Sequence, residues 1–595
     1  MTTPDSSLSA LQKAYSTIQL LRRQLNQLEQ SKSEAIAIIG MGCRAPDAKN
    51  PDELWNLIRS GKDAVSEIPA SRWDAKSYFD PRPGTPGKSY TMHGGFIEGV
   101  DQFDASFFQI SAREAESMDP QQRLLLEVTW EALENAGIPP STLFGSLTGV
   151  FIGVTSSDYG LLQASPQMQM EVNPYFNTGT PLNACAGRIS YTLGLNGPSI
   201  ALDTACSSSL SAIHQACNSL RLKDCDVAIT GGVNLILSPL LNITLSSAGM
   251  MSADGRCKTF SEDANGYVRG EGCGVVILKR LSDVNLSGDR VLGIIRATGS
   301  NHDGASSGFT VPNGMAQQKL ITQTLDKAKI LASQIDYVEA HGTGTALGDP
   351  IEANSLGQVL GKAGGRSRAL LVGSIKSNIG HLESAAGVMG LIKIIQALRH
   401  REIPPSLHLQ HLSKKIAWQD LNIKPVTELT PWISDGHPRY ASLSAFGASG
   451  SNAHLILEEA NTSEVDYNTL EKENTFHMIG ISAKNMPALK ALAQSYQNQF
   501  EDSSVSFANF CKNVNQSRDH FNHRLAICSQ SISEFQEKIK CFLTEEEKTN
   551  VHWSSLAKNN KLQIAFVFGG QGSIYFGMGK AVSYTHLTLP TKRIV

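Results

Sequence analysis

The stretch from residue 199 to residue 210 constrains the fold most, because it joins two kinds of secondary structure through one reactive side chain. The apolar run 199–202 predicts a buried strand, which the small and polar residues after it bring to an end. From Leu210 onward, apolar side chains recur at spacings of 3, 4 and 3, which predicts one face of a helix. Cys206 therefore lies at a strand-to-helix turn, where free backbone N–H groups and the helix dipole favour a thiolate and predict a lowered pKa. Taken alone, a small buried cysteine is an equal alternative.

Buried strands and amphipathic helices alternate along residues 34–459, and this alternation predicts an α/β architecture. One set of strands ends near residue 278, and a second set begins near Val291 and closes with a hairpin-like segment at 443–457. Two successive sets of similar content indicate a duplicated fold, although no clear sequence repeat joins them. Residues 35–44 predict a strand that runs into a Gly-rich turn, but the glycine spacing is not that of a dinucleotide site.

Composition narrows the classes of function. The formal net charge is −3 at pH 7, which gives no basis for nucleic-acid binding. No apolar run is long enough to span a bilayer and residues 1–33 lack a signal-peptide core, so we expect a soluble, cytoplasmic protein with no membrane partner. The 10 cysteines are scattered without paired spacing, which argues against a metal site or a disulfide framework.

Changes of character along the chain predict segments on either side of the 34–459 domain. Residues 1–33 carry apolar side chains at heptad-like spacing and predict a coiled-coil or docking helix; a single amphipathic helix packed on its own domain is the alternative. Residues 460–561 start with a polar linker and continue as a smaller α/β unit. A strand and a Gly-rich turn then open a further domain over 562–580. The tail 581–595 does not continue that domain, which suggests a truncated or frameshifted reading.

Two histidines have settings similar to that of Cys206. His341 follows the apolar residues 337–340, and His381 follows residues 373–380, so we expect both at carboxyl ends of strands, where open α/β sheets gather ligands. One imidazole could act as a base for the thiol, or two neutral imidazoles could donate hydrogen bonds to an oxygen that gains negative charge. Lys376 could hold an acidic partner, for which we select Glu352.

Three motifs carry a resemblance to a known family. Asp203–Ser209 (DTACSSS), Glu339–Pro350 (EAHGTGTALGDP) and Lys376–His381 (KSNIGH) resemble the catalytic motifs of β-ketoacyl synthases, in detail those of the ketosynthase domain of bacterial modular type I polyketide synthases. Supporting matches lie at residues 36–43, 118–123, 266–272 and 446–454. The resemblance covers about residues 34–459. Residues 1–33 are similar to the docking coiled coils of such subunits, 460–560 to the linker before an acyltransferase, and 566–572 to the start of an acyltransferase.

The resemblance implies a thiolase-like, duplicated five-layer α/β/α/β/α fold, followed by a small α/β linker subdomain. It also implies decarboxylative Claisen condensation, in which Cys206 holds an acyl chain while a malonyl-type extender forms the attacking enolate. His341 and His381 would stabilise the enolate, and Lys376 would orient the His381 region, through Glu352. The backbone N–H groups of Cys206 and Phe446 would form the oxyanion hole, Phe446 would gate the acyl pocket, and Thr343 and Thr345 would contact the pantetheine arm.

The same resemblance implies the cofactors and partners. No cofactor is expected to be bound, because substrates arrive on the phosphopantetheine of an acyl carrier protein. The expected assembly is a homodimer that receives its substrate from an upstream polyketide or peptide synthase subunit through the N-terminal helix.

Three rival functions stay open on the sequence alone. A degradative thiolase would share the fold but uses a second cysteine as its base. A hydrolase could combine Cys206, His341 and Asn378. A scaffold that only docks neighbouring subunits would show no decarboxylation. The nucleophile and histidine positions carry no inactivating replacement, so we expect a competent condensing enzyme.

Overall fold

The structure is a computed structural model that describes most of the chain. The described residues are 15–20, 22, 33–165, 173–287, 289–434, 436–460, 476–498, 506–546 and 548–556. Residues 15–20 are helical, and the rest of the predicted docking helix is nearly all outside the described residues. The predicted acyltransferase start at 562–580 and the tail 581–595 also lie outside them.

The first half of the fold is a five-stranded half-sheet in the order β5-β4-β6-β7-β1. β4 pairs in parallel with β5 and with β6, whereas β7 runs antiparallel to both β6 and β1. The strands are β1 (Ile36–Arg44), β4 (Thr148–Gly153), β5 (Ser199–Leu202), β6 (Val227–Asn234) and β7 (Gly272–Arg280).

The second half repeats this plan as β10-β9-β14-β15-β8, with the same pattern of parallel and antiparallel pairs. In both halves the chain visits the half-sheet positions in the same sequence, so the topology confirms the predicted duplication. Antiparallel pairing of β1 with β8 joins the halves into an 11-stranded sheet, and β12 (Ile423–Pro425) pairs outside β10. The other strands are β8 (Gly293–His302), β9 (Ile335–Glu339), β10 (Leu370–Gly373), β14 (Tyr440–Phe446) and β15 (Ser451–Glu458).

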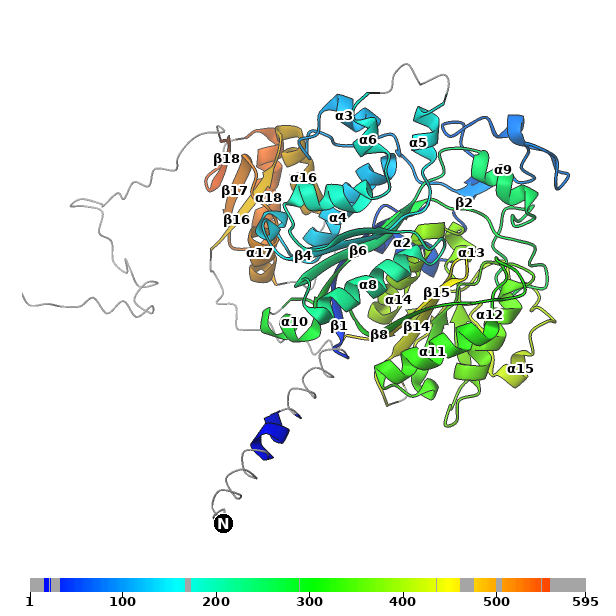
Figure 1. Cartoon of the computed structure of the whole chain (residues 1–595). Coiled ribbons are helices and arrows are strands. Elements are labelled where there is room, and N and C mark those ends of the chain that lie inside the picture. Colours follow the sequence, from blue (N-terminus) through cyan, green and yellow to red (C-terminus); the bar gives the residue numbers. More distant parts are fainter. Residues whose placement is uncertain are drawn as a thin grey trace, which may run out of the picture.

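Helices cover the half-sheets in the predicted five layers. The central pair, α8 and α14, contacts strands of both halves, as Figure 1 shows. α4 and α7 lie on the outer face of the first half-sheet, while α11 lies on the outer face of the second and packs against α12. The bounds are α4 (Pro120–Asn135), α7 (Ala184–Leu193), α8 (Ser208–Leu222), α11 (Gly314–Ala328), α12 (Gly348–Leu356) and α14 (Ala386–His400).

The predicted Gly-rich turn near residue 40 is wrong, because β1 continues through both glycines. A Cβ on Gly40 would lie 2.5 Å from the carbonyl oxygen of Ala132, and a Cβ on Gly42 would lie 2.8 Å from that of Val128. The glycines therefore allow α4 to approach the strand closely, and they do not mark a reversal of the chain.

The prediction that 199–202 form a buried strand is wrong in its burial. β5 is the outermost strand of the first half, and Ser199 and Ile200 are exposed. A short apolar run has the same pattern at an edge and in the interior, so the run alone could not distinguish the two.

Residues 476–556 form the smaller α/β unit expected there. Its antiparallel sheet β16-β17-β18 packs against three helices around a separate apolar core. Lys484 lies 4.0 Å from the ring centre of Phe107, and Arg518 pairs with Glu134 of α4, so the unit docks on the larger domain (Figure 1). The elements are β16 (His477–Ala483), α16 (Met486–Asn498), α17 (Phe507–Gln516), β17 (His523–Ser529), α18 (Ile532–Thr544) and β18 (Val551–Ser555).

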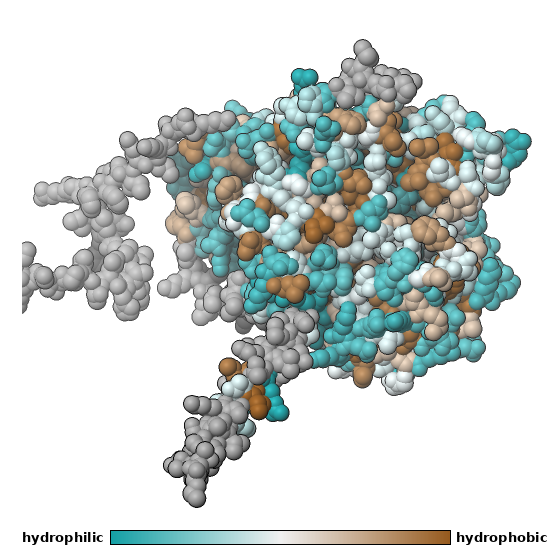
Figure 2. Space-filling view, viewed as in Figure 1, coloured by the Kyte–Doolittle hydropathy of each residue, from teal (hydrophilic) through white to brown (hydrophobic). Residues whose placement is uncertain are grey.

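The surface is mixed in polarity. Figure 2 shows mainly hydrophilic and neutral surface with separate hydrophobic patches, one of them over α9 (Leu240–Ser247). Within the described ranges, no helix has the length and apolar character needed to cross a membrane.

Candidate active site

Cys206 lies in the predicted strand-to-helix turn, two residues before α8 begins. Ala205 has φ of +53°, a left-handed conformation that is strained for any residue but glycine. The turn between β14 and β15 packs against the Cys206 turn. The Ser207 hydroxyl donates to the carbonyl of Ser451 at 2.9 Å, and the backbone N–H of Ala448 donates toward the Cys206 thiol. The sequence thus placed this residue correctly.

The expectation of a lowered thiol pKa is wrong. Cys206 is only partly exposed to solvent. This burial, followed by the negative charge of Glu383, raises the pKa of the thiol to about 12, and Lys376 opposes the rise only in part. Burial therefore favours the thiol over the thiolate in the resting site.

His341 follows β9 by two residues, as predicted. Its Nδ1 accepts a hydrogen bond from the backbone N–H of Phe446 at 3.4 Å, so the neutral ring carries its proton on Nε2. Glu352 accepts from the backbone N–H groups of His341 and Gly342 at 2.7 and 2.8 Å. Burial raises the pKa of the Glu352 carboxyl to about 7.

His381 is not directly at a strand end, because the short helix α13 (Lys376–Ile379) separates it from β10. Its Nδ1 accepts from the backbone N–H of Glu383 at 3.2 Å, so this ring too carries its proton on Nε2. That Nε2 is buried, and it has no hydrogen-bond partner in the part of the chain that the structure describes. The rings of His341 and His381 lie edge to face, with centroids 5.3 Å apart.

Both imidazoles are held neutral. Burial, followed by the positive charge of Lys376, keeps the pKa of His341 and of His381 well below the usual value. Neutral rings with a proton on Nε2 are hydrogen-bond donors, so the pair suits an oxygen that gains negative charge.

Lys376 is buried and acts electrostatically on Cys206 and on both histidines. Burial lowers its pKa, while Glu339 and then Glu352 oppose that change. Glu339 accepts from the backbone N–H of Ile375 at 2.6 Å, next to Lys376, and its carboxylate pairs with Lys393 at 2.7 Å. The sequence missed Glu339 because its partners come from distant segments.

Thr343 and Thr345 lie in the turn after His341, with their hydroxyl oxygens 3.3 Å apart. Asp349, which the sequence did not single out, shapes this turn by accepting from the backbone N–H groups of Gly344, Thr345 and Phe260. Burial raises the pKa of Asp349 to about 6.

The backbone N–H of Phe446, expected in the oxyanion hole, lies beside His341 in the resting site. The N–H of Phe446 is engaged with His341, and the ring of Phe446 packs 5.5 Å from that imidazole. The N–H that faces the thiol belongs to Ala448, two residues further on. Sequence analysis did not single out Ala448 as a donor to the thiol.

The hydrolase alternative lacks its third member. The Asn378 amide donates to the carbonyl of Lys62 at 3.0 Å and lies beside Ser377, so it orients neither histidine. Among the described residues, no group of three His, Cys, Asp or Glu side chains could hold a metal ion.

Three family models match the chain. The β-ketoacyl synthase N-terminal domain matches residues 33–284, the C-terminal domain of the same family matches 292–410, and the ketoacyl-synthetase C-terminal extension matches 413–527. A phenolphthiocerol/phthiocerol polyketide synthase of Mycobacterium tuberculosis is 48% identical over 461 residues, which are 77% of this chain and 21% of that protein. Polyketide synthase GfsB of Streptomyces halstedii is 42% identical over 92% of this chain and 10% of its own length.

The solved structures that resemble this chain are also ketosynthases. The oxazolomycin ketosynthase domain OzmH KS7 of Streptomyces albus aligns with a TM-score of 0.83 and 37% identity, covering 88% of this chain and 90% of that one. The ketosynthase from module 6 of the bacillaene synthase of Bacillus subtilis aligns with a TM-score of 0.79 and 35% identity, covering 88% and 87%.

The chain belongs to the β-ketoacyl synthase family, with the thiolase-like fold that the resemblance implied. Its ketosynthase domain is of the kind that catalyses carbon–carbon condensation during chain elongation in modular polyketide synthases. The chain spans only about a fifth of the mycobacterial relative and a tenth of the Streptomyces relative.

Proposed function

We propose that this ketosynthase domain elongates an acyl chain held on Cys206, with His341 and His381 as the two donors that stabilise the extender enolate. One observation carries the proposal: two neutral imidazoles meet edge to face, and in each the Nδ1 atom is occupied by a backbone N–H, so that each Nε2 carries a proton. The motifs and the family membership agree with it.

The first half-reaction is a thioester exchange. The Cys206 sulfur attacks the carbonyl carbon of an acyl thioester, the new carbon–sulfur bond forms, and the bond to the carrier thiol breaks. The leaving sulfur takes up the proton that Cys206 loses, so a thiol of pKa about 12 needs no net base for the exchange. Backbone N–H groups at Ala448 and Cys206 would hold the oxyanion of the tetrahedral intermediate. The family resemblance also implies the backbone N–H of Phe446 for this role, and that group lies beside His341 in the resting site.

The second half-reaction is decarboxylative condensation. The extender loses its carboxylate as CO₂, and the electron pair of the broken bond becomes the enolate. The Nε2–H groups of His341 and His381 donate to the enolate oxygen. The enolate carbon then attacks the acyl carbonyl on Cys206, a carbon–carbon bond forms, and the sulfur leaves as a thiolate that takes up a proton. Burial, followed by the charge of Lys376, keeps both rings neutral.

Carrier-bound substrates fit the turn beside the histidines. Both acyl donor and extender would arrive on the phosphopantetheine of an acyl carrier protein, and the hydroxyls of Thr343 and Thr345 would contact that arm. Asp349 supports this role because its carboxylate fixes the backbone of the turn.

A homodimer would form through the edge of the first half-sheet. Among the described residues no strand pairs with the outer side of β5, Ile200 is 39% exposed, and nearby Tyr191 of α7 is 87% exposed. An unpaired strand with apolar neighbours is a template for pairing with a second copy.

We further propose that residues 1–33 dock an upstream synthase subunit. The domain boundaries given by the sequence analysis and a cytoplasmic location are part of the same proposal.

Labelling with an acyl thioester, read by intact mass, tests the proposal. The wild-type chain should gain one acyl group, Cys206→Ala should gain none, and Cys528→Ala, which removes a partly exposed cysteine of the smaller unit, should label as the wild type does. Offered a malonyl-thioester as well, the wild type should release CO₂ and the condensed product. Persistent labelling of Cys206→Ala, or free acid as the only product, would contradict the proposal.

A further inference from the structure

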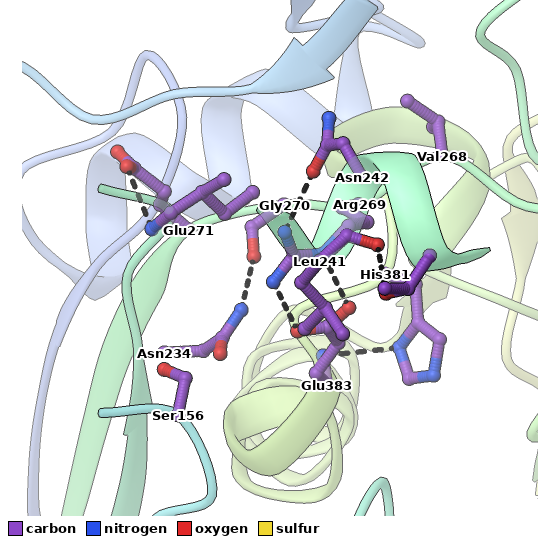
Figure 3. A network of polar contacts seen from close by, with 12 residues as sticks. Ser156, Asn234, Leu241, Asn242, Val268, Arg269, Gly270, Glu271, His381 and Glu383 are labelled. Atoms are coloured by element: carbon purple, nitrogen blue, oxygen red, sulfur yellow. Dashed lines mark hydrogen bonds and ion pairs between the residues drawn. The ribbon is translucent and has the colours of Figure 1, made fainter. Parts of the chain in front are cut away.

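The segment 266–272 (GYVRGEG) matches the family, yet no step of the proposed reaction uses it. The structure places it directly against His381 (Figure 3). The His381 N–H donates to the carbonyl of Val268 at 2.7 Å, and the N–H of Gly270 donates to the carbonyl of His381 at 2.8 Å. The ring of Tyr267 stands edge-on to the imidazole, with centroids 5.2 Å apart.

Arg269 binds Glu383, the residue whose backbone N–H occupies Nδ1 of His381. Its side chain is fully buried and forms a two-pronged ion pair with Glu383, with Nε to Oε1 at 2.7 Å and Nη2 to Oε2 at 2.9 Å. Its Nη1 donates to Asn242 of α9 at 2.6 Å, so the guanidinium itself is anchored on a second element (Figure 3). A buried guanidinium holds a planar carboxylate in one orientation, because both hydrogen bonds must be kept.

Glu383 has φ of +45°, a left-handed conformation that costs energy for a residue with a Cβ. In this conformation the backbone N–H of Glu383 points back at Nδ1 of His381, at 3.2 Å. The side chain of the same residue is the one that Arg269 grips. The ion pair and the strained backbone therefore act on one residue, and that residue determines which nitrogen of His381 is the donor.

We propose that Arg269 and Glu383 are positioning residues for His381, holding the ring in the form whose Nε2–H points into the active site. Neither residue touches the substrate; both act through the imidazole. The inference rests on the proposed role of His381. It predicts that loss of the pair damages the decarboxylation half-reaction but does not slow the acylation of Cys206. Another turn positions Cys206, and the charge of Glu383 raises the pKa of its thiol, so removal of that charge favours the thiolate.

The matched control is the second ion pair of the same segment. Glu271 is fully buried and receives two hydrogen bonds from Arg72, at 2.9 and 2.7 Å, but it also binds the N–H groups of Ile97 and Ile236 and lies away from His381. Glu383→Gln and Glu271→Gln each remove one buried carboxylate charge from a two-pronged pair with arginine. Only the first should change the function of the histidine.

The experiment measures two rates on the full-length chain: acylation of Cys206 by an acyl thioester, and release of CO₂ from a malonyl-thioester. In Glu383→Gln, CO₂ release should fall about 100-fold, the usual scale for a displaced catalytic group, while acylation of Cys206 should not fall. Arg269→Lys, which keeps the charge but loses the fork, should fall about tenfold. Glu271→Gln should keep the wild-type ratio of the two rates even if it melts earlier.

Nitrogen-15 NMR of labelled histidine reports the proton position without relying on turnover. In the wild type, the signals of His381 should show a neutral ring with the proton on Nε2. In Glu383→Gln, they should show a mixture of rings protonated on Nε2 and rings protonated on Nδ1. Unchanged CO₂ release in Glu383→Gln, or a parallel loss of both rates in Glu383→Gln and Arg269→Lys, would overturn the inference. A wild-type chain that acylates Cys206 but releases no CO₂ would instead refute the proposed function, so the two failures can be distinguished.

Discussion

β5 and β10 hold the same place in the two halves of the fold, and each leads toward a proposed catalytic side chain. β5 lies at the edge of the sheet and reaches Cys206 through one tight turn, whereas β10 is covered by β12 and reaches His381 only after α13. In both connections a non-glycine residue is left-handed: Ala205 before Cys206, and Glu383 after His381. The duplicated half-sheets therefore supply two equivalent strand ends. Local backbone strain and local contacts determine the chemical role of the side chain at each end.

The largest effect should separate the chemistry of the two halves. His381→Ala and His341→Ala each remove a donor to the enolate, so decarboxylation should fall about 10²–10³-fold, while acylation of Cys206 stays within about tenfold. Rates of CO₂ release and of acyl labelling measure this. Equal loss of both rates would mean that the two connections do not divide the reaction.

The pH dependence of the free energy of unfolding tests the contact between Glu352 and the backbone of His341. His381 has no such contact with Glu352. The pKa of Glu352 is raised from 4.5 to about 7, so the folded protein holds this proton more tightly than the unfolded chain does. The stabilisation is complete below about pH 4.5 and is lost as pH rises through about 7, by up to about 3 kcal/mol. Glu352→Gln cannot lose a proton, so its free energy of unfolding should lack this decline.

Urea unfolding of both proteins at about pH 5 and about pH 8 measures the difference. Asp349 has a pKa raised to about 6 and contributes a similar decline to both proteins, so it cancels in the comparison. A difference between the two proteins that does not change with pH would contradict the assignment.

The contact between the central helices joins the two connections and can be disturbed directly. A Cβ on Gly387 of α14 would lie 2.9 Å from Cβ of Leu210 in α8, tighter than packed carbons tolerate. Gly387→Ala should therefore lower the free energy of unfolding by about 1–3 kcal/mol. Gly187→Ala in α7, where a Cβ meets open space, is the control and should gain about 0.4–1 kcal/mol.

The smallest effect concerns the strain beside Cys206. Ala205→Gly should relieve a left-handed alanine but add freedom to the unfolded chain, so stability should change by no more than about 1 kcal/mol. Acylation should slow slightly because the turn is less rigid. A large loss of stability would mean that the methyl group of Ala205 is needed for packing, in contrast to the role of Glu383.

The sequence predicted the α/β duplication, the turn at Cys206 and the residues that meet in the site, because periodicity and short motifs are local signals. It did not predict the raised pKa of the thiol, since that depends on burial in the folded protein and on the charge of Glu383, which is distant in the sequence. For the same reason it did not single out Ala448, the backbone donor to the thiol.

Partnerships between distant segments were also out of reach of the sequence. Arg269 and Glu383 were both visible in or beside motifs, but their ion pair spans more than a hundred residues of chain, and no local pattern indicates it. The turn predicted near residue 40 was wrong for the same reason. Position 40 needs a glycine because α4 packs against it, and α4 lies in a distant part of the sequence.

The pairing of β1 with both β7 and β8 has a consequence for synthesis on the ribosome. β1 ends at Arg44, whereas its first partner in the sheet begins only at Gly272. At elongation rates of about 5–20 residues per second, this apolar strand waits on the order of 10–50 s with both edges unpaired. We expect the nascent chain to need a chaperone or early cover by α4 over that interval. Slowing translation between residues 44 and 272 should therefore increase aggregation of the newly made protein.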